Sequence, residues 1–127
     1  MISFEKALGI HPAALRFRID RAEVLAANLA NVDTPNFLAR DISFEQVLND
    51  QMKGDGTTSA GHISIGAAGG MSNPLYRIPS QPSSDGNTVE LHLEQAEFTR
   101  NSLQFQSSFT FLNSKLKSLE LAINGRV

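Results

Sequence analysis

The sequence has 127 residues, of which 41% are hydrophobic, and its 11 basic and 13 acidic residues leave a formal charge of −2. This length suits one domain or an elongated structure that never closes into a globe. The charge balance argues against a nucleic-acid partner. No apolar run approaches the roughly 20 residues that span a bilayer. The lack of cysteine excludes disulfides and thiolate chemistry.

The N-terminal stretch MISFEKALGIHPAALRFR has no basic start, no continuous apolar core and no small-residue cleavage site. A cleaved secretory signal is therefore not expected. The protein either stays in the cytoplasm or leaves the cell by a route that needs no cleaved signal.

An apolar stripe predicts a first helix over about 12–32, with Pro12 as a natural first-turn residue. Asp33-Thr34-Pro35 ends this helix, because a residue that precedes proline is pushed out of helical geometry. The residues of the stripe recur at spacings of four and three along one face: Leu15, Ile19, Ala22, Ala26 and Leu29.

Asn28 and Asn31 stand just before this stop, although asparagine is a poor helix former. In the heptad phase of the helix, both fall on the face opposite the stripe. Two interpretations remain open. Either the asparagines end a frayed helix, or their amides, which donate and accept, bind groups of a neighbouring subunit.

The middle of the chain has a different character. Ser43 and Gln46 have the spacing of a capping box, which predicts a short helix over about 44–52. The segment 53–86 then holds seven of the nine glycines and three of the five prolines. Its HISI and LYRI stretches are either short strands or parts of a flexible loop, since short alternations are weak evidence.

A second helix is predicted over 88–124, with Asn87 and Glu90 resembling a cap and Gly125 as its C-terminal stop. About 36 residues of helix would run roughly 54 Å, too long for a compact domain of this size. Its seam residues also recur at four and three: Leu91, Gln95, Phe98, Ser102, Phe105, Phe109, Leu112, Leu116, Leu119 and Ile123.

These elements predict a mainly α fold in which the two long helices pack antiparallel as a coiled-coil-like pair. We divide the chain into a first helix with its bend and short helix (1–52), an insert that is flexible or contains some β structure (53–86), and the second helix (87–127). Ile19, Ala22 and Leu29 of the first stripe are expected to face the Phe105–Leu116 part of the second seam.

One partner helix cannot cover all the apolar residues of these helices. Six of them lie off the two seams: Phe17, Val24, Leu93, Leu103, Phe111 and Leu121. Such a pair should be only marginally folded alone and should gain its core by self-association.

Catalytic chemistry has little support. The histidines, His11, His62 and His92, are scattered without metal-ligand spacing. The glycine-rich stretch GDGTTSAGHISIGAAGG lacks the lysine of a phosphate loop. We therefore expect no catalytic, cofactor or metal site and no cofactor, and a coiled-coil adaptor or export chaperone remains an alternative to a structural subunit.

The stretch LAANLANVDTPNFLARDISFEQVL, residues 25–48, resembles the N-terminal signature of the flagellar rod, hook and filament-junction proteins. The stretch DGNTVELHLEQAEFTRNSLQFQ points the same way, and the resemblance covers about 12–50 and 85–125. The residues that match the signature, and form the expected subunit-assembly motif, are Asn28, Asn31, Asp33, Thr34, Pro35, Phe37 and Phe44.

Further features of the sequence resemble one group within this family. Asp33, where an asparagine is more usual, the triplet Ala39-Arg40-Asp41 and the short length are similar to the proximal-rod members of this family. Asn36-Phe37-Leu38 departs from a more usual Gly-Tyr-Lys-like triplet. Asparagine tolerates a positive φ better than most residues, so Asn36 could still adopt the glycine geometry.

The resemblance implies a structural subunit of the bacterial flagellar basal body, located in the periplasmic rod and exported through the flagellar type III apparatus. It implies assembly with copies of itself and other rod proteins into a helical tube that transmits torque for motility. The implied partners include the export gate and a membrane-ring adaptor, with no nucleic acid and no small-molecule substrate. The Asp-Thr-Pro motif would be the bend after the inner helix, with the asparagines bonding across subunits.

Overall fold

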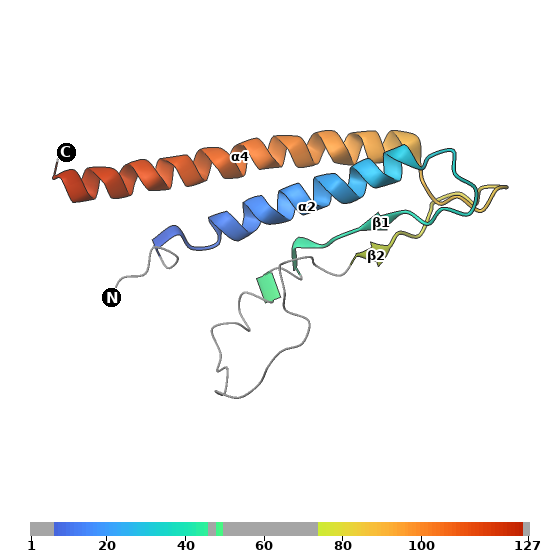
Figure 1. Ribbon diagram of the computed structural model, residues 1–127, viewed down its shortest axis with the longest axis horizontal. Coiled ribbons are helices and arrows are strands. Elements are labelled where there is room, and N and C mark those ends of the chain that lie inside the picture. Colours follow the sequence, from blue (N-terminus) through green and yellow to red (C-terminus); the bar gives the residue numbers. More distant parts are fainter. Residues whose placement is uncertain (1–6, 46–47, 50–73, 126–127) are drawn as a thin grey trace, which may run out of the picture.

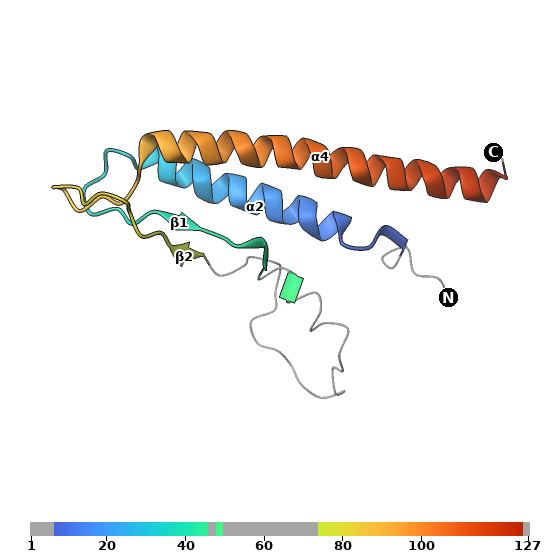
Figure 2. The same cartoon turned by 180° about the vertical axis from the view of Figure 1, so that it is seen from behind.

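The computed structural model describes residues 7–45, 48–49 and 74–125. Its elements, in chain order, are α2 (His11–Ala30), β1 (Arg40–Asp41), β2 (Leu75–Tyr76) and α4 (Leu91–Asn124). Figure 1 shows α2 and α4 side by side and running in opposite directions, with the two-stranded ribbon along α2. The predicted antiparallel helix pair and mainly helical fold are therefore confirmed, and the view from behind in Figure 2 shows the same arrangement.

α2 begins one residue before Pro12 and ends two residues earlier than the sequence predicts. Asn31 leaves helical geometry with φ −108° and ψ 20°, and its backbone N–H donates to the carbonyls of the last helical turn. The helix has 20 residues, so it is about 30 Å long.

α4 begins at Leu91 rather than at residue 88, because the predicted cap does not form. Glu90 is the N-cap, with extended backbone and no side-chain capping bond, while the Asn87 side chain turns away to the end of α2. The C-terminal stop is confirmed, since Gly125 adopts the left-handed conformation with φ 62°. With 34 residues and about 51 Å, α4 extends well past the start of α2.

Between the helices, the ribbon pairs Arg40 with Tyr76 and Asp41 with Leu75 in antiparallel register. The LYRI stretch thus supplies a strand of two residues, while HISI lies outside the described residues. Helical backbone at 44–45 and 48–49 belongs to the predicted short helix, whose remaining residues also lie outside them. The Ser43 hydroxyl accepts a hydrogen bond from the Glu45 N–H at 3.3 Å, as a capping residue should.

The apolar core is small. Within the described residues, the buried hydrophobic side chains are Phe17 and Leu25 of α2 and Ala39 and Ile42 beside β1. Phe44 adds an aromatic contact, with its ring centroid 5.2 Å from that of Phe17. None of the helices in this part of the chain is both long and apolar enough to cross a membrane.

The contact face between the helices is rotated away from the predicted seams. Asn101 is 1% exposed and its Nδ2 donates to the Arg18 carbonyl at 2.8 Å, while Glu94 is fully buried. Ile19, which was expected to face α4, is 56% exposed. In this rotation Asn101 Nδ2 and the Glu94 carboxylate have hydrogen-bond partners, whereas Asn101 Oδ1 is buried without one among the described residues. An exposed isoleucine costs less than a buried polar group without a partner.

The predicted seam residues therefore divide into two sets. Those that are half-buried are Leu15, Ala22, Leu29, Phe105, Leu112 and Leu119. Those that are exposed are Ile19, Ala26, Leu91, Gln95, Phe98, Ser102, Phe109, Leu116 and Ile123.

Candidate functional site

The turn after α2 is built from local hydrogen bonds. Asn31 Nδ2 donates to the Ala27 carbonyl at 2.8 Å, and the Thr34 hydroxyl donates to Asn31 Oδ1 at 3.1 Å. Asn36 has φ 61°, so asparagine does adopt the positive φ of the glycine that is usual there. Asp33, Thr34 and Pro35 are exposed, and the turn that holds them lies at the end of the helix pair where α2 stops and α4 begins.

Asn87 clamps this turn to the start of α4. Its side chain is 5% exposed, and Nδ2 lies 3.0, 2.7 and 2.9 Å from the carbonyl oxygens of Asn31, Val32 and Thr34. Its Oδ1 accepts from the Val89 N–H at 2.8 Å. One amide therefore caps the C-terminal end of α2, where carbonyls lack helical partners, and orients the strand that leads into α4.

Gly86 allows the two turns to approach closely. It has φ +75°, and a Cβ built on it would lie 2.5 Å from Asn36 Oδ1. The Asn36 N–H donates to the Asp85 carbonyl at 3.0 Å in the same place. Glycine adopts this backbone conformation without strain, and any side chain here would also have to displace Asn36 Oδ1.

Five charged side chains join α2, the ribbon and α4, and we call them the ionic cluster: Arg21, Asp41, Arg77, Glu94 and Glu97. Arg21 binds both oxygens of Asp41 at 2.9 Å and Glu97 at 2.8 Å. Arg77 binds Asp41 at 2.6 Å and Glu94 at 2.5 Å. Glu94 is fully buried and the other four side chains are 14–25% exposed. Because removing one partner of such a pair leaves the other charge uncompensated, we interpret the cluster as fixing how the ribbon sits on the helices.

The surroundings shift the pKa values of the buried Glu94 and the half-buried Asp41 in opposite directions. Burial raises the pKa of Glu94, and this effect exceeds the opposing hydrogen bond from Asn28 and the charge of Arg77. Burial would also raise the pKa of Asp41, but hydrogen bonds from Arg21 and Arg77 outweigh it and lower the pKa. Asp41 is therefore the carboxylate around which both arginines are organised.

Asn28 completes this arrangement from the centre of the interface. Its Nδ2 donates to the Arg40 carbonyl at 2.7 Å and to Glu94 at 3.1 Å, and its Oδ1 accepts from the Arg40 N–H at 3.1 Å. The amide thus pairs with the free edge of β1 as a neighbouring strand would. The side chain is 1% exposed, which corrects the expectation that it lies on the face opposite the helix contact.

The structure therefore separates the predicted motif into two groups. Asn28 and the half-buried Phe44 stabilise the packing of the ribbon on α2. Asn31, with Asp33, Thr34 and Pro35, shapes the exposed turn, and half-buried Phe37 donates its N–H to the Thr34 carbonyl at 3.3 Å. All the bonds found for the two asparagines are within the described part of this chain, and their role between subunits stays a prediction.

The sequence reasoning missed the ionic cluster. A signal was present: Glu94, Glu97 and Asn101 recur at three and four on α4, and Arg21 precedes Asn28 by seven residues on α2. These spacings mark one polar face on each helix. A search restricted to apolar periodicity passes over them.

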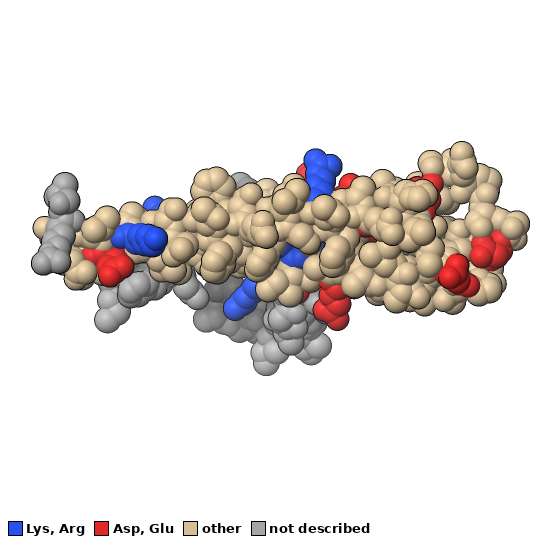
Figure 3. Space-filling view, turned by 90° about the horizontal axis from the view of Figure 1, so that it is seen from above, with Lys and Arg blue, Asp and Glu red and all other residues tan. Residues whose placement is uncertain are grey.

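Most of the surface of α4 is apolar or uncharged. Figure 3 looks onto α4 from the side away from α2 and shows only scattered charged side chains along it. The large apolar residues exposed on this helix are Leu91, Leu93, Phe98, Leu103, Phe109, Phe111, Leu116, Leu121 and Ile123. Exposed apolar surface of this extent is typical of a site of protein association.

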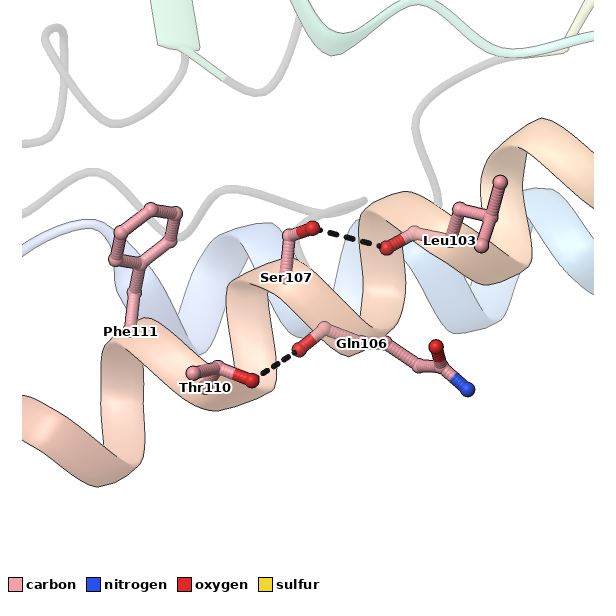
Figure 4. Close-up of a pocket in the computed structure, with 5 residues that line it drawn as sticks. All are labelled: Leu103, Gln106, Ser107, Thr110 and Phe111. Carbon is pink, nitrogen blue, oxygen red and sulfur yellow. Dashed lines mark hydrogen bonds between the residues drawn. The ribbon is translucent and has the colours of Figure 1, made fainter.

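A shallow depression on this helix does not resemble a ligand site. Figure 4 shows Leu103 and Phe111 extending from the helix while Ser107 and Thr110 bond back to it. Their hydroxyls donate to the carbonyls of Leu103 and Gln106 at 3.1 and 2.9 Å. These polar groups do not converge on a common point, and within the described residues no group of three potential metal ligands occurs.

Known proteins similar to this chain over almost its whole length share one name. The chain is 48% identical to a protein of Aeromonas hydrophila over 98% of this chain and 97% of the relative. It is 42% identical to one of Cereibacter sphaeroides over 98% and 99%, and 41% identical to one of Salmonella typhimurium over 95% of each. Each relative is named flagellar basal body rod protein FlgB, and no family model matches the sequence.

Proposed function

We propose that this chain, which belongs to the FlgB family of flagellar basal body rod proteins, joins copies of itself and other rod proteins in a helical tube. The chain is a structural subunit of the rod, so its task is to bind neighbours and to hold its shape under load. The observation that carries the proposal is a contrast within the described residues: four apolar side chains form the buried core, and many are exposed on α4. A subunit surrounded by neighbours in a tube would bury that surface.

The finer features of the role follow from the same proposal. The subunit is exported through the flagellar type III apparatus, engages the export gate and a membrane-ring adaptor, and takes its place in the periplasmic, proximal part of the rod. There the stiff antiparallel helices transmit torque along the tube. An elongated chain with a small core supports this reading, because it can pass unfolded through a narrow channel and complete its packing on arrival.

Within the proposed tube, the motif has two tasks. Asn28 and Phe44 hold the ribbon against α2, so that each subunit presents one shape to its neighbours. Asp33, Thr34 and Pro35, exposed in the turn after α2, meet the next subunit along the axis. The seam residues that remain exposed in one chain are buried between chains.

The test is to delete the gene from its motile host, to restore it with an epitope tag, and to extract basal bodies with detergent. We expect the tagged chain to co-purify with the basal body, and the deletion strain to lack rods in electron micrographs. A cytoplasmic adaptor or export chaperone would instead be absent from washed basal bodies. The tagged chain would then remain in the cytoplasmic fraction.

A further inference from the structure

The ribbon presents an outer face that the packing of this chain does not use. Because Arg40 pairs with Tyr76, two steps along the strands bring Leu38 opposite Ile78 on the same side of the ribbon. Leu38 is 47%, Tyr76 62% and Ile78 91% exposed. The Arg40 guanidinium lies 5.5 Å from the centroid of the Tyr76 ring, and no salt bridge within the described residues engages it. We call these four residues the ribbon outer face.

α2 presents a second unused face. Ile19 is nine residues before Asn28, which at about 100° per residue places it half a turn around the helix from the amide that holds the ribbon. The exposed residues that continue this row at spacings of four, three and four are Glu23, Ala26 and Ala30. No salt bridge within the described residues engages Glu23. We call these four residues the α2 outer face.

The two outer faces complement each other in charge and in spacing. One has a single cation among apolar side chains. In the other, Glu23 lies between Ile19 and the small Ala26, and the exposed Arg16 lies one turn beyond Ile19 in the same row. Residues two apart on a strand lie about 7 Å apart, and residues four apart on a helix about 6 Å. Arg40 can therefore meet Glu23 while Leu38 and Ile78 lie against Ile19 of the same helix.

We propose that the ribbon outer face of one copy docks on the α2 outer face of a second copy, with Arg40 paired to Glu23. The two faces lie on opposite sides of α2, so the contact is heterologous, and each copy keeps one free face of each kind. Repetition then gives a continuous stack of helix, ribbon and helix rather than a closed dimer. This contact rests on the proposed function and specifies which surfaces the self-assembly uses.

A charge exchange tests the contact in the full-length chain. Arg40→Glu and Glu23→Arg each place like charges together at every contact, so we expect the number of intact basal bodies to fall about tenfold or more. The double variant carrying both changes restores the attraction, and we expect rods to return. The matched control combines Glu23→Arg with Lys117→Glu, which restores the same net charge at an unrelated position of α4 and should not recover rods.

Secretion of each variant into the medium is measured alongside, so that a chain that is not exported is distinguished from one that does not assemble. Normal rods with either single change would overturn the proposal. Loss with the single changes and no recovery with the exchange would also overturn it, because Arg40 and Glu23 would then not face each other. If the unaltered tagged chain were itself missing from basal bodies, the proposed function would fail, whereas failure of the exchange alone leaves that function standing.

Discussion

At the scale of single residues, side-chain amides hold the elements together where the apolar core is small. Asn28 joins α2, the edge of β1 and Glu94, and Asn87 joins the end of α2 to the start of α4. A side-chain amide is suited to this because it donates and accepts in fixed directions without carrying a charge. The arrangement of α2, β1 and α4 where they meet thus depends on two asparagines that are far apart in the sequence.

The two motif asparagines should differ in their contribution to stability. Asn28→Ala leaves the Arg40 N–H and carbonyl without their partner and removes a bond to Glu94, so we expect the free energy of unfolding to fall by about 1–3 kcal/mol. Asn31→Ala removes only bonds within one turn and should change it by less than about 0.5 kcal/mol. Circular dichroism melts with trimethylamine N-oxide, which strengthens burial, measure both. Equal losses from the two changes would contradict the buried role of Asn28.

The ionic cluster predicts a pH dependence centred on Asp41. Because its pKa is lowered in the folded chain, the stability it contributes is present above its ordinary pKa of about 4 and is lost as the pH falls through the folded value. Asp41→Asn should therefore lower the free energy of unfolding by about 1–3 kcal/mol at pH 7, and by much less near pH 2. Thermal melts of the Asp41→Asn variant and of the unaltered protein at the two pH values give the difference in stability at each pH. Glu94 is present in both proteins, so its titration affects both. A difference that does not change with pH would show that the charge of Asp41 is not what the arginines require.

At the scale of elements, the sequence predicts where helices lie better than how they are rotated. The Pro12 start and the glycine at 125 follow from local backbone preferences and agree with the structure, whereas α2 ends two residues before the stop predicted from Thr34-Pro35. The rotation does not follow, because apolar periodicity assigns Glu94 and Asn101 to the solvent. Their partners, Arg77 and Arg18, come from other elements, and only the folded chain brings them together.

The clamp between α2 and α4 can be tested with an isosteric change. Asn87→Asp keeps an oxygen to accept from Val89 but loses the donor and sets a carboxylate against three carbonyl oxygens. We expect the free energy of unfolding to fall by about 1–3 kcal/mol and amide hydrogen exchange in the last turn of α2 to become faster. Asn113→Asp, at an exposed position of α4, is the control and should leave both quantities unchanged. Normal exchange at the end of α2 in the Asn87 variant would contradict the clamp.

At the scale of the whole molecule, the chain is long, thin and incompletely covered. α4 extends beyond α2, and its apolar side chains lie exposed on several sides of the helix. The need for further partners could be predicted from the sequence, since it holds more apolar faces than one helix pair can bury. Which face of each helix meets a neighbour could not be predicted, because contacts with the ribbon and the ionic cluster rotate the helices away from the predicted seams.

A surface substitution on α4 should separate folding from assembly. Phe109 is 56% exposed in one chain, so Phe109→Asp should leave export intact but abolish rods, because a buried, unpaired charge is costly once the tube forms. Phe109→Leu is the control and should keep them. Removal of residues 58–69, a glycine-rich stretch of the sequence, should harm assembly less than Phe109→Asp, since a change in the length of the segment that joins two elements costs little. Swimming by the Phe109→Asp strain, but not by the deletion strain, would contradict this account.

The most direct test of the central claim is thiol accessibility, because the chain has no cysteine of its own. Phe109→Cys and Leu116→Cys are introduced singly, and a bulky maleimide is applied both to the secreted subunit and to intact purified basal bodies, with the cysteine-free chain as background. If assembly buries the exposed side of α4, both thiols react readily in the secreted subunit and are protected in the basal body. Equal reaction in the two states would contradict the claim that neighbouring subunits complete the core of this protein.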